Sequence, residues 1–209
     1  MNAPAITLYG TPLSGHAHRV EALLNQLGLP YGYVNAPADV RKTPEFLALN
    51  PLGQIPVLVD GDTVLCDSTA ILIYLIEQYA PDSAWLPRDP RTRAEVQRWL
   101  SIASAEVRFG PAMARAVRQW NMPGHLESAL AVAERLFRFM DAHLETRSFL
   151  ATDHPTLADL ACHAYVAHAP EGGLDLTPYP HIQAWLARVA EIPGFRDMDA
   201  LPVPQPTVR

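Results

Sequence analysis

The sequence predicts an α/β N-terminal domain followed by an all-α C-terminal domain. Up to about residue 80, short β-prone runs alternate with apolar residues at helical spacing. A proline-rich stretch without periodicity follows, and beyond it apolar residues recur only at three- and four-residue steps. The 209 residues, 49% of them hydrophobic, are enough for two small cores. We therefore expect domains at 1–80 and 94–200, a linker at 81–93 and an extended or frayed tail at 201–209.

The first domain is expected to open with a β-α-β unit. A β-prone run at 6–9 is broken by a Gly-Thr-Pro sequence, and apolar residues at helical spacing then continue to Leu27. A Gly-Leu-Pro sequence at 28–30 ends this helix, and an alternating strand follows at 31–34.

The rest of the domain completes the order β-α-β-α-β-β-α. The apolar runs 55–59 and 63–65 are joined by an Asp-Gly-Asp turn, which favours a hairpin. An apolar face over 68–79 predicts a helix, with Asp67 and Ser68 available as caps.

The second domain shows helical periodicity alone. The pattern begins near Val96 and returns at 126–144, 157–165 and 182–189. The segment 156–159 has the S/T-x-x-D form of a capping box ahead of an apolar run, and we expect it to nucleate this domain.

Composition excludes several classes of function. Sixteen basic against twenty-two acidic residues give a net charge of -6, which opposes binding to nucleic acid. No apolar run approaches the roughly 18 residues of a membrane-spanning helix, and the N-terminus lacks the basic region and cleavage pattern of a signal peptide. We therefore expect a cytoplasmic protein without nucleic-acid or membrane partners.

Cysteine and histidine usage limits the chemistry further. Cys66 and Cys162 are the only cysteines, and they form neither a disulfide framework nor a CxxC pair. Any thiol chemistry must therefore use the sulfur of another molecule. Two histidine pairs have spacings of two and five residues, unlike metal ligands on one helical face, so we expect no metal site.

A proline at the entrance of the third strand indicates a site for a peptide. Pro56 cannot donate to a strand ladder, and in the cis form it would expose the backbone N–H and C=O of Ile55 to an extended peptide. The alternative is that Pro56 only marks an edge strand.

Asp67 and Ser68, at the start of a predicted helix, suit the α-amino acid end of such a peptide. The free N–H groups of a helix start and its positive dipole attract a carboxylate, while the Asp67 side chain can hold an ammonium group. The alternative is that both residues only cap the helix.

Several motifs together resemble the cytosolic glutathione S-transferase family. They are, in chain order, Ser14 ahead of Arg19-Val20, Pro44-Glu45-Phe46, Asn50-Pro51 with Gly53-Gln54-Ile55-Pro56, Asp67-Ser68, and Thr156-Leu157-Ala158-Asp159. The resemblance spans nearly the whole chain. It implies a thioredoxin-like N-terminal domain that binds glutathione, an electrophile site between the domains, and a homodimer that serves detoxification.

The resemblance assigns glutathione contacts to individual positions. Pro56 matches the family's cis-proline, and Ile55 matches the residue whose backbone pairs with the cysteinyl part of glutathione. Asp67 and Ser68 match the positions that hold the γ-glutamyl carboxylate and amine, and Gln54 would lie beside the γ-glutamyl and cysteinyl portions.

The glycyl end of glutathione is assigned to two basic residues. Arg41 and Lys42 match basic positions that reach the glycyl carboxylate, and Lys42 is the only lysine in the chain. The alternative is that both belong to the solvated surface.

Activation of the thiol is assigned to the loop after the first strand. Ser14 aligns with the catalytic serine of the phi-, theta- or nu-like classes and would donate a hydrogen bond to the thiolate, unless it is a plain N-cap. His16 matches an asparagine that touches the thiol in some bacterial and fungal-like members, and would donate a second bond or act as a base, unless it is simply solvated. The loop has no catalytic tyrosine or cysteine, which speaks against the tyrosine, beta and omega classes.

We therefore expect an enzyme that adds the glutathione thiolate to an apolar electrophile, or reduces a peroxide or disulfide with it. The residues expected to line the acceptor pocket are Arg108, Phe109, Met113 and Trp120, although an aromatic and a methionine four residues apart also fit a core. A non-catalytic interaction module with the same fold is the alternative. A reductase that uses its own cysteine is disfavoured by the cysteine-free first loop.

Overall fold

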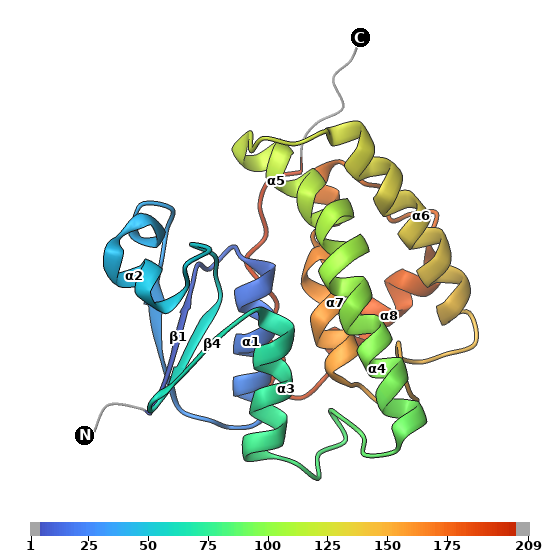
Figure 1. The fold of residues 1–209 in the computed structure, drawn as a ribbon. Coiled ribbons are helices and arrows are strands. Elements are labelled where there is room, and N and C mark those ends of the chain that lie inside the picture. The colour runs from blue at the N-terminus through green and yellow to red at the C-terminus, as the bar shows by residue number, and fades with distance from the viewer. Residues whose placement is uncertain (1–4, 204–209) are drawn as a thin grey trace. The chain divides into compact units, whose positions relative to one another are not determined.

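The computed structural model describes residues 5–203 and divides them into two compact units (Figure 1). Within that range, unit 1 contains the chain as far as Leu86 together with Gly194–Asp199, and unit 2 contains Pro87–Pro193 and the residues from Ala200 onward. The segment Gly194–Asp199 thus belongs to unit 1, whereas the sequence predicted it to be part of the second domain, 94–200.

Unit 1 contains a four-stranded mixed sheet in the order β2-β1-β3-β4, and the predicted fold class is confirmed. The strands are β1 (Ile6–Gly10), β2 (Tyr31–Asn35), β3 (Val57–Asp60) and β4 (Thr63–Cys66). β1 pairs with β2 in parallel and with β3 in the antiparallel sense, and β3 and β4 form the predicted hairpin. β3 begins two residues later than the sequence predicts, because Pro56 has no N–H for the ladder.

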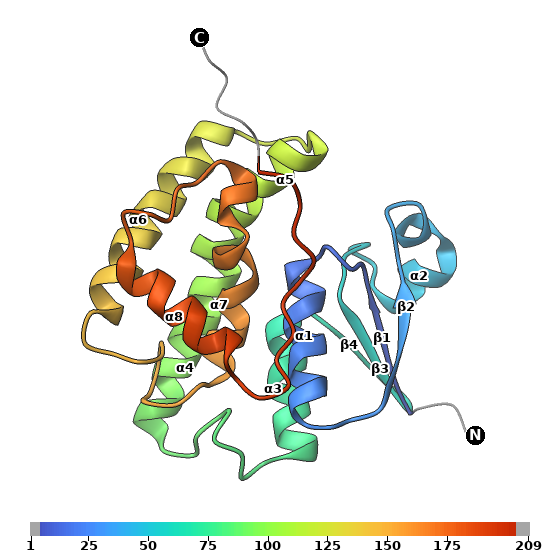
Figure 2. The ribbon, with the colours of Figure 1, turned by 180° about the vertical axis from the view of Figure 1, so that it is seen from behind.

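Helices cover both faces of the sheet. α1 (Gly15–Gln26) and α3 (Ser68–Tyr79) lie side by side on one face, and α2 (Pro44–Leu49) lies on the other (Figures 1 and 2). Phe46 of α2 packs with Val57 in the core on its own face. Because side chains alternate along a strand, the buried residue next to Val57 on β3 points to the opposite face, toward α1 and α3.

Unit 2 is helical, as predicted. Its helices are α4 (Pro90–Ile102), a π-helical segment (Ala103–Ala112), α5 (Met113–Trp120), α6 (Leu126–Leu144), α7 (Leu157–Ala167) and α8 (Pro180–Ala190). α4 begins inside the expected linker 81–93, because the Asp89 side chain accepts from Thr92 N at 2.9 Å and a proline suits the first helical turn. No helix in the described range is long and apolar enough to cross a membrane.

The π-helical segment was not foreseen. Pro111 lies inside it and has no N–H for the usual bond to a carbonyl four residues earlier, so a wider helical register fits the sequence locally. The packing of this segment also requires a glycine at position 110, because a Cβ on Gly110 would lie 3.0 Å from the backbone nitrogen of Ala133 on α6. The segment therefore packs directly against the backbone of α6.

The predicted capping box at the start of α7 is confirmed. Thr156 Oγ1 accepts from Ala158 N at 3.3 Å, and Asp159 Oδ2 accepts from Thr156 N at 2.8 Å. Asp159 Oδ1 also accepts from Leu150 N and from the indole of Trp185, both at 2.9 Å. All of these groups are buried, so the box joins α7 to α8 and to the chain before α7.

The first residues of the expected tail are held by hydrogen bonds and form neither helix nor strand. Leu201 N donates to Glu171 Oε1 at 2.9 Å, and Gln119 Nε2 donates to Pro202 O at 3.0 Å. The rest of the predicted tail, 204–209, lies outside the described residues.

Candidate functional site

The start of α1 presents a serine hydroxyl. Ser14 is half-buried, has extended backbone angles and is the N-cap of α1. Its Oγ accepts from Ala17 N at 3.3 Å, so this bond leaves the hydroxyl proton available for another acceptor. The first-turn N–H groups and the positive end of the helix dipole favour negative charge at this place. Ser14 is thus a cap that retains its ability to donate.

The start of α3 is built on a strained aspartate. Asp67 has φ of 72°, a left-handed conformation that is uncommon outside glycine. Its Oδ1 accepts from Thr69 N at 2.8 Å, from Thr69 Oγ1 at 2.5 Å and from Ala70 N at 3.2 Å. Within the described residues, Oδ2 has no partner, and the residue is exposed. A second carboxylate oxygen therefore remains for a ligand ammonium group.

The electrostatics at Asp67 keep its carboxyl ionised. Burial by itself raises the pKa of Asp67, but hydrogen bonds from Thr69 and Ala70 and the charge of Arg19 outweigh that effect and lower the pKa below its ordinary value. The carboxylate is therefore fully formed at neutral pH.

Ser68 is buried, unlike the exposed Asp67 that precedes it. It is the first residue of α3 and is buried, so it does not cap the helix as the sequence suggested; Asp67 alone does. Its Oγ accepts from Arg19 Nη1 at 3.3 Å and lies 3.5 Å from His16 Nδ1. The structure therefore brings His16 to the predicted γ-glutamyl site.

Arg19 also belongs to the candidate site, and the sequence did not predict a role for it. It is buried on α1, and its guanidinium group links the start of α3 to the helix that carries Ser14. The available signal was a charged residue on an otherwise apolar helix face, between Ala17 and Val20, both of which are fully buried. A buried arginine needs partners, and the nearest helix start provides them.

The entrance of β3 has the form expected for peptide binding. The Ile55–Pro56 bond is cis, as predicted. Ile55 is half-buried, and its backbone N–H and C=O have no partner among the described residues. The buried Asn50 shapes the preceding turn: its Nδ2 donates to Gln54 O at 2.8 Å, and its Oδ1 accepts from Leu52 N at 3.1 Å. This turn leaves the Gln54 side chain exposed.

The two predicted basic residues lie beside that turn. Arg41 and Lys42 form part of a 3-10 turn, Val40–Lys42, and a Cβ added at Gly53 would lie 3.3 Å from the Arg41 carbonyl oxygen. Arg41 Nε is buried without a hydrogen-bond partner among the described residues, and Lys42 is exposed. Both are therefore placed to meet an acidic group near the turn.

Strand register brings these segments to one edge of the sheet. Tyr9 of β1 pairs with Val57 of β3, and Val57 pairs with Cys66 of β4. The loop that leads to Ser14, the Ile55–Pro56 segment and the Asp67–Ser68 segment extend from these three adjacent strand ends. Neighbouring strands are about 4.8 Å apart, so the three segments lie within reach of one tripeptide.

The four residues expected to line an acceptor pocket lie on the π-helical segment and on α5. Phe109 and Trp120 are 54% and 45% exposed, so neither is part of the core. Guanidinium groups lie against both rings: Arg108 Cζ is 5.4 Å from the Phe109 ring centroid, and Arg115 Cζ is 5.0 Å from that of Trp120. Met113 is half-buried. Exposed aromatic surface of this kind suits an apolar molecule.

The cysteines do not resemble nucleophiles. Cys66 donates to Leu49 O at 3.5 Å, and burial raises the pKa of its thiol. Cys162 is fully buried. A raised pKa lowers the thiolate fraction, as expected for an inert thiol.

Comparison with known families matches both units. Residues 8–83 match the model of the glutathione S-transferase N-terminal domain, and residues 125–193 match that of the glutathione S-transferase C-terminal domain. Glutathione S-transferase 3 of Zea mays is 38% identical over 220 residues, which cover 96% of each chain.

Solved structures are similar along the same length. A glutathione S-transferase from Pseudomonas fluorescens has a TM-score of 0.86 at 33% identity, covering 93% of this chain and 98% of the other. A glutathione transferase homologue from Drosophila mojavensis, determined with bound glutathione, has a TM-score of 0.79 at 26% identity, covering 90% and 88%.

Proposed function

Because the chain belongs to the glutathione S-transferase family, we propose that unit 1 binds glutathione at the sheet edge described above and that Ser14 activates its thiol. The observation that supports the proposal is the strand register, in which Tyr9, Val57 and Cys66 lie at adjacent strand ends next to the three segments. Each element offers the type of group that one part of a γ-glutamyl tripeptide requires.

The binding roles follow from the chemistry of the available groups. Asp67 Oδ2 accepts from the γ-glutamyl ammonium group, and the positive end of the α3 dipole attracts its carboxylate, since the N–H groups of Thr69 and Ala70 already donate to Asp67. The backbone of Ile55 pairs with the cysteinyl residue in strand fashion, beside Gln54. Arg41 and Lys42 attract the glycyl carboxylate.

Activation of the thiol requires a modest free energy. A thiol with an ordinary pKa of about 8.5 is mostly protonated at neutral pH, and lowering that pKa by two units takes about 2.7 kcal/mol. A hydroxyl donor and the start of α1 supply stabilisation of that order. The thiol proton passes to solvent, and Ser14 O–H donates to the sulfur anion. The sulfur then forms a bond to the electrophilic carbon, and the bond from that carbon to its leaving group breaks, so that an aryl halide releases halide.

His16 has a different proposed position from the one expected from sequence. With Nδ1 3.5 Å from Ser68 Oγ, its ring serves the γ-glutamyl end through Ser68, and Ser14 remains the primary donor to sulfur. This assignment makes the thiol pKa more sensitive to Ser14 than to His16.

The acceptor is proposed to be a largely apolar electrophile that contacts Arg108, Phe109, Met113 and Trp120. In the reduction of a peroxide or disulfide, the same thiolate would attack one oxygen or sulfur and break the O–O or S–S bond. An alcohol or thiol would leave, and a second glutathione would complete the reaction as glutathione disulfide. We also propose a cytoplasmic homodimer that functions in detoxification without a metal; light scattering of the purified chain tests the dimer, and metal analysis tests the last point.

The test of the proposed function is the pKa of the bound thiol. Ultraviolet titration of the glutathione complex is expected to show ionisation well below the free value, and Ser14→Ala is expected to raise this pKa by about one unit or more and to slow addition to an aryl halide. Thr43→Ala is a matched control, because Thr43 caps α2 and its Oγ1 accepts from Phe46 N at the same 3.3 Å.

The control should leave the thiol pKa unchanged. An identical pKa in the wild type and the Ser14→Ala variant would remove Ser14 from the reaction and leave it as a cap. Failure of glutathione to bind at millimolar concentration would remove the transferase function.

A further inference from the structure

A segment from the far end of the chain lies along α1, the helix that Ser14 caps. We call Gly194–Asp199 the C-terminal strap; it belongs to unit 1 although it follows the last helix of unit 2. Figure 2 shows it running along α1 toward the start of that helix. A Cβ at Gly194 would lie 3.8 Å from Nε2 of Gln26, the last residue of α1, and the strap then reaches His18 in the first turn.

The contact at His18 is specific. His18 is only 8% exposed, and its Nε2 lies 2.8 Å from the carbonyl oxygen of Arg196. A carbonyl oxygen only accepts, so Nε2 carries the proton and the tautomer is defined. The ring of Phe195 meets the imidazole edge-on, at 5.8 Å between centroids and 83° between planes. The strap therefore holds the imidazole by one hydrogen bond and one ring contact.

The same residue is joined to Ser14. The backbone N–H of His18 donates to the carbonyl oxygen of Ser14 at 2.8 Å, which is the first hydrogen bond of α1. A continuous path thus runs from Arg196 through the His18 ring and amide to Ser14. First turns of helices fray most readily, and this one is fixed from outside by the strap.

We propose that the C-terminal strap positions Ser14 for donation to the glutathione sulfur and that His18 is the positioning residue. The inference rests on the proposed function of Ser14 and adds to it the device that fixes the donor. Hydroxyl-to-sulfur donation depends on distance and direction, and small displacements of a donor have large effects on rate. Nothing in this role requires His18 to touch glutathione.

The experiment removes the N–H group of the His18 ring and keeps an aromatic ring in contact with Phe195. His18→Phe retains an aromatic ring against Phe195 but cannot donate to Arg196 O, whereas His18→Gln restores a donor. For His18→Phe we expect the thiol pKa of bound glutathione to rise toward the free value and kcat to fall about three- to tenfold, with KM for glutathione changed by less than about twofold. His18→Gln should recover most of both.

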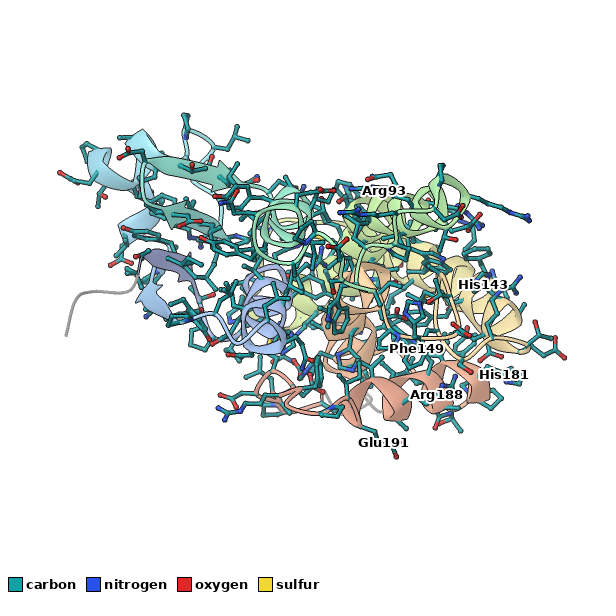
Figure 3. The ribbon with its side chains drawn as sticks, turned by 90° about the horizontal axis from the view of Figure 1, so that it is seen from below. Arg93, His143, Phe149, His181, Arg188 and Glu191 are labelled. Atoms are coloured by element: carbon teal, nitrogen blue, oxygen red, sulfur yellow. The ribbon has the colours of Figure 1, made fainter. Side chains whose placement is uncertain are left out.

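A matched control exists in unit 2. His143 Nε2 makes the same kind of bond, to the carbonyl oxygen of Leu150 at the same 2.8 Å, and Figure 3 shows it among the side chains of the helical unit. His143→Phe therefore removes an equivalent hydrogen bond far along the sequence from Ser14. It should lower the unfolding free energy and leave the thiol pKa unchanged.

Three results would overturn the inference. One is an unchanged thiol pKa and kcat in His18→Phe while Ser14→Ala shifts both, which would leave the proposed function intact. Another is an equal shift in His143→Phe, which would make the effect global. The third is no effect of Ser14→Ala itself, which would end the role of Ser14 together with that of the strap. If His18→Phe does not fold, Phe195→Ala decides alone: a raised thiol pKa supports the strap, and an unchanged one rejects it.

Discussion

The starts of α3 and α7 both depend on an aspartate, and the two aspartates are used in opposite ways. Asp159 is fully buried, and both of its oxygens accept hydrogen bonds from three other parts of unit 2. Asp67 is exposed, and only Oδ1 is occupied by its own helix. A carboxylate with every acceptor position filled stabilises the fold, whereas one with an oxygen to spare can hold a ligand.

The pKa values of the two carboxyl groups are shifted in opposite directions, in keeping with this difference. Burial raises the pKa of the Asp159 carboxyl, against the effect of its hydrogen bonds. At Asp67 the hydrogen bonds and Arg19 outweigh burial and lower the pKa. Capping residues are therefore better sorted into structural and functional ones by burial and unused acceptors than by residue type.

The largest effect is expected at Asp159. Asp159→Ala removes the capping box and leaves the buried N–H groups of Leu150 and Trp185 without their acceptor, which should lower the unfolding free energy by about 3 kcal/mol or more. Denaturant unfolding measures this. Asp141→Ala is the control, because Asp141 accepts from His181 N and Ile182 N at the start of α8 but is only partly buried. An equal loss in both variants would contradict the special role of the buried box.

The next effect concerns binding and not stability. Asp67→Ala should weaken glutathione binding by about 1.5 to 3 kcal/mol, the cost of losing a hydrogen bond between charged groups. Isothermal titration measures it. Asp89→Ala is matched, since Asp89 caps α4 through Thr92 N and Thr92 Oγ1 much as Asp67 caps α3 through Thr69. The control should bind glutathione normally; weakened binding in both would show that the loss arises from helix capping.

Most elements of both units, and the residues that cap them, could be predicted from the sequence. The apolar periodicity predicted the sheet, the hairpin and the helical unit, and the S/T-x-x-D spacing predicted the box at α7. Local patterns specify elements well because they depend on neighbours in the chain. Ser14, Pro56 and Asp67 could be singled out because turn and cap chemistry is also local.

The parts that were missed depend on contacts between distant residues. Arg19 reaches its hydrogen-bond partner on α3 only when α1 and α3 pack together. His18 reaches its partner only when the C-terminal strap, which begins at residue 194, packs along α1. Likewise, the buried Ser68 looks like a second cap in the sequence. The π-helical segment results from Pro111 together with close packing on Ala133, and the sequence displays only the first of these.

The pH dependence of stability should distinguish Asp67 from an ordinary exposed carboxylate. Its pKa in the folded chain lies below the ordinary 3.8, so its contribution is present above the unfolded value and is lost as pH falls through the folded one. The difference in unfolding free energy between wild type and Asp67→Asn should thus be constant from about pH 7 to pH 5 and shrink at lower pH. A difference that stays constant as the pH falls well below 5 would contradict the lowered pKa, because an ordinary exposed carboxylate has the same pKa in the folded and unfolded chain.

The smallest effect is expected at Lys42, and it tests the opposite end of the ligand from Asp67. Lys42 is exposed, so its attraction to the glycyl carboxylate is screened by water and salt and contributes only about 0 to 1 kcal/mol. Lys42→Ala should therefore raise the Kd for glutathione less than about fivefold, and the ratio of the two Kd values should approach one as salt is added. Arg138→Ala, which removes another exposed cation on α6, should leave Kd unchanged at every salt concentration. The contact proposed for Asp67 is a direct hydrogen bond at short range, so its effect should persist in high salt. A salt-independent loss at Lys42 would indicate an equally direct contact for the lysine.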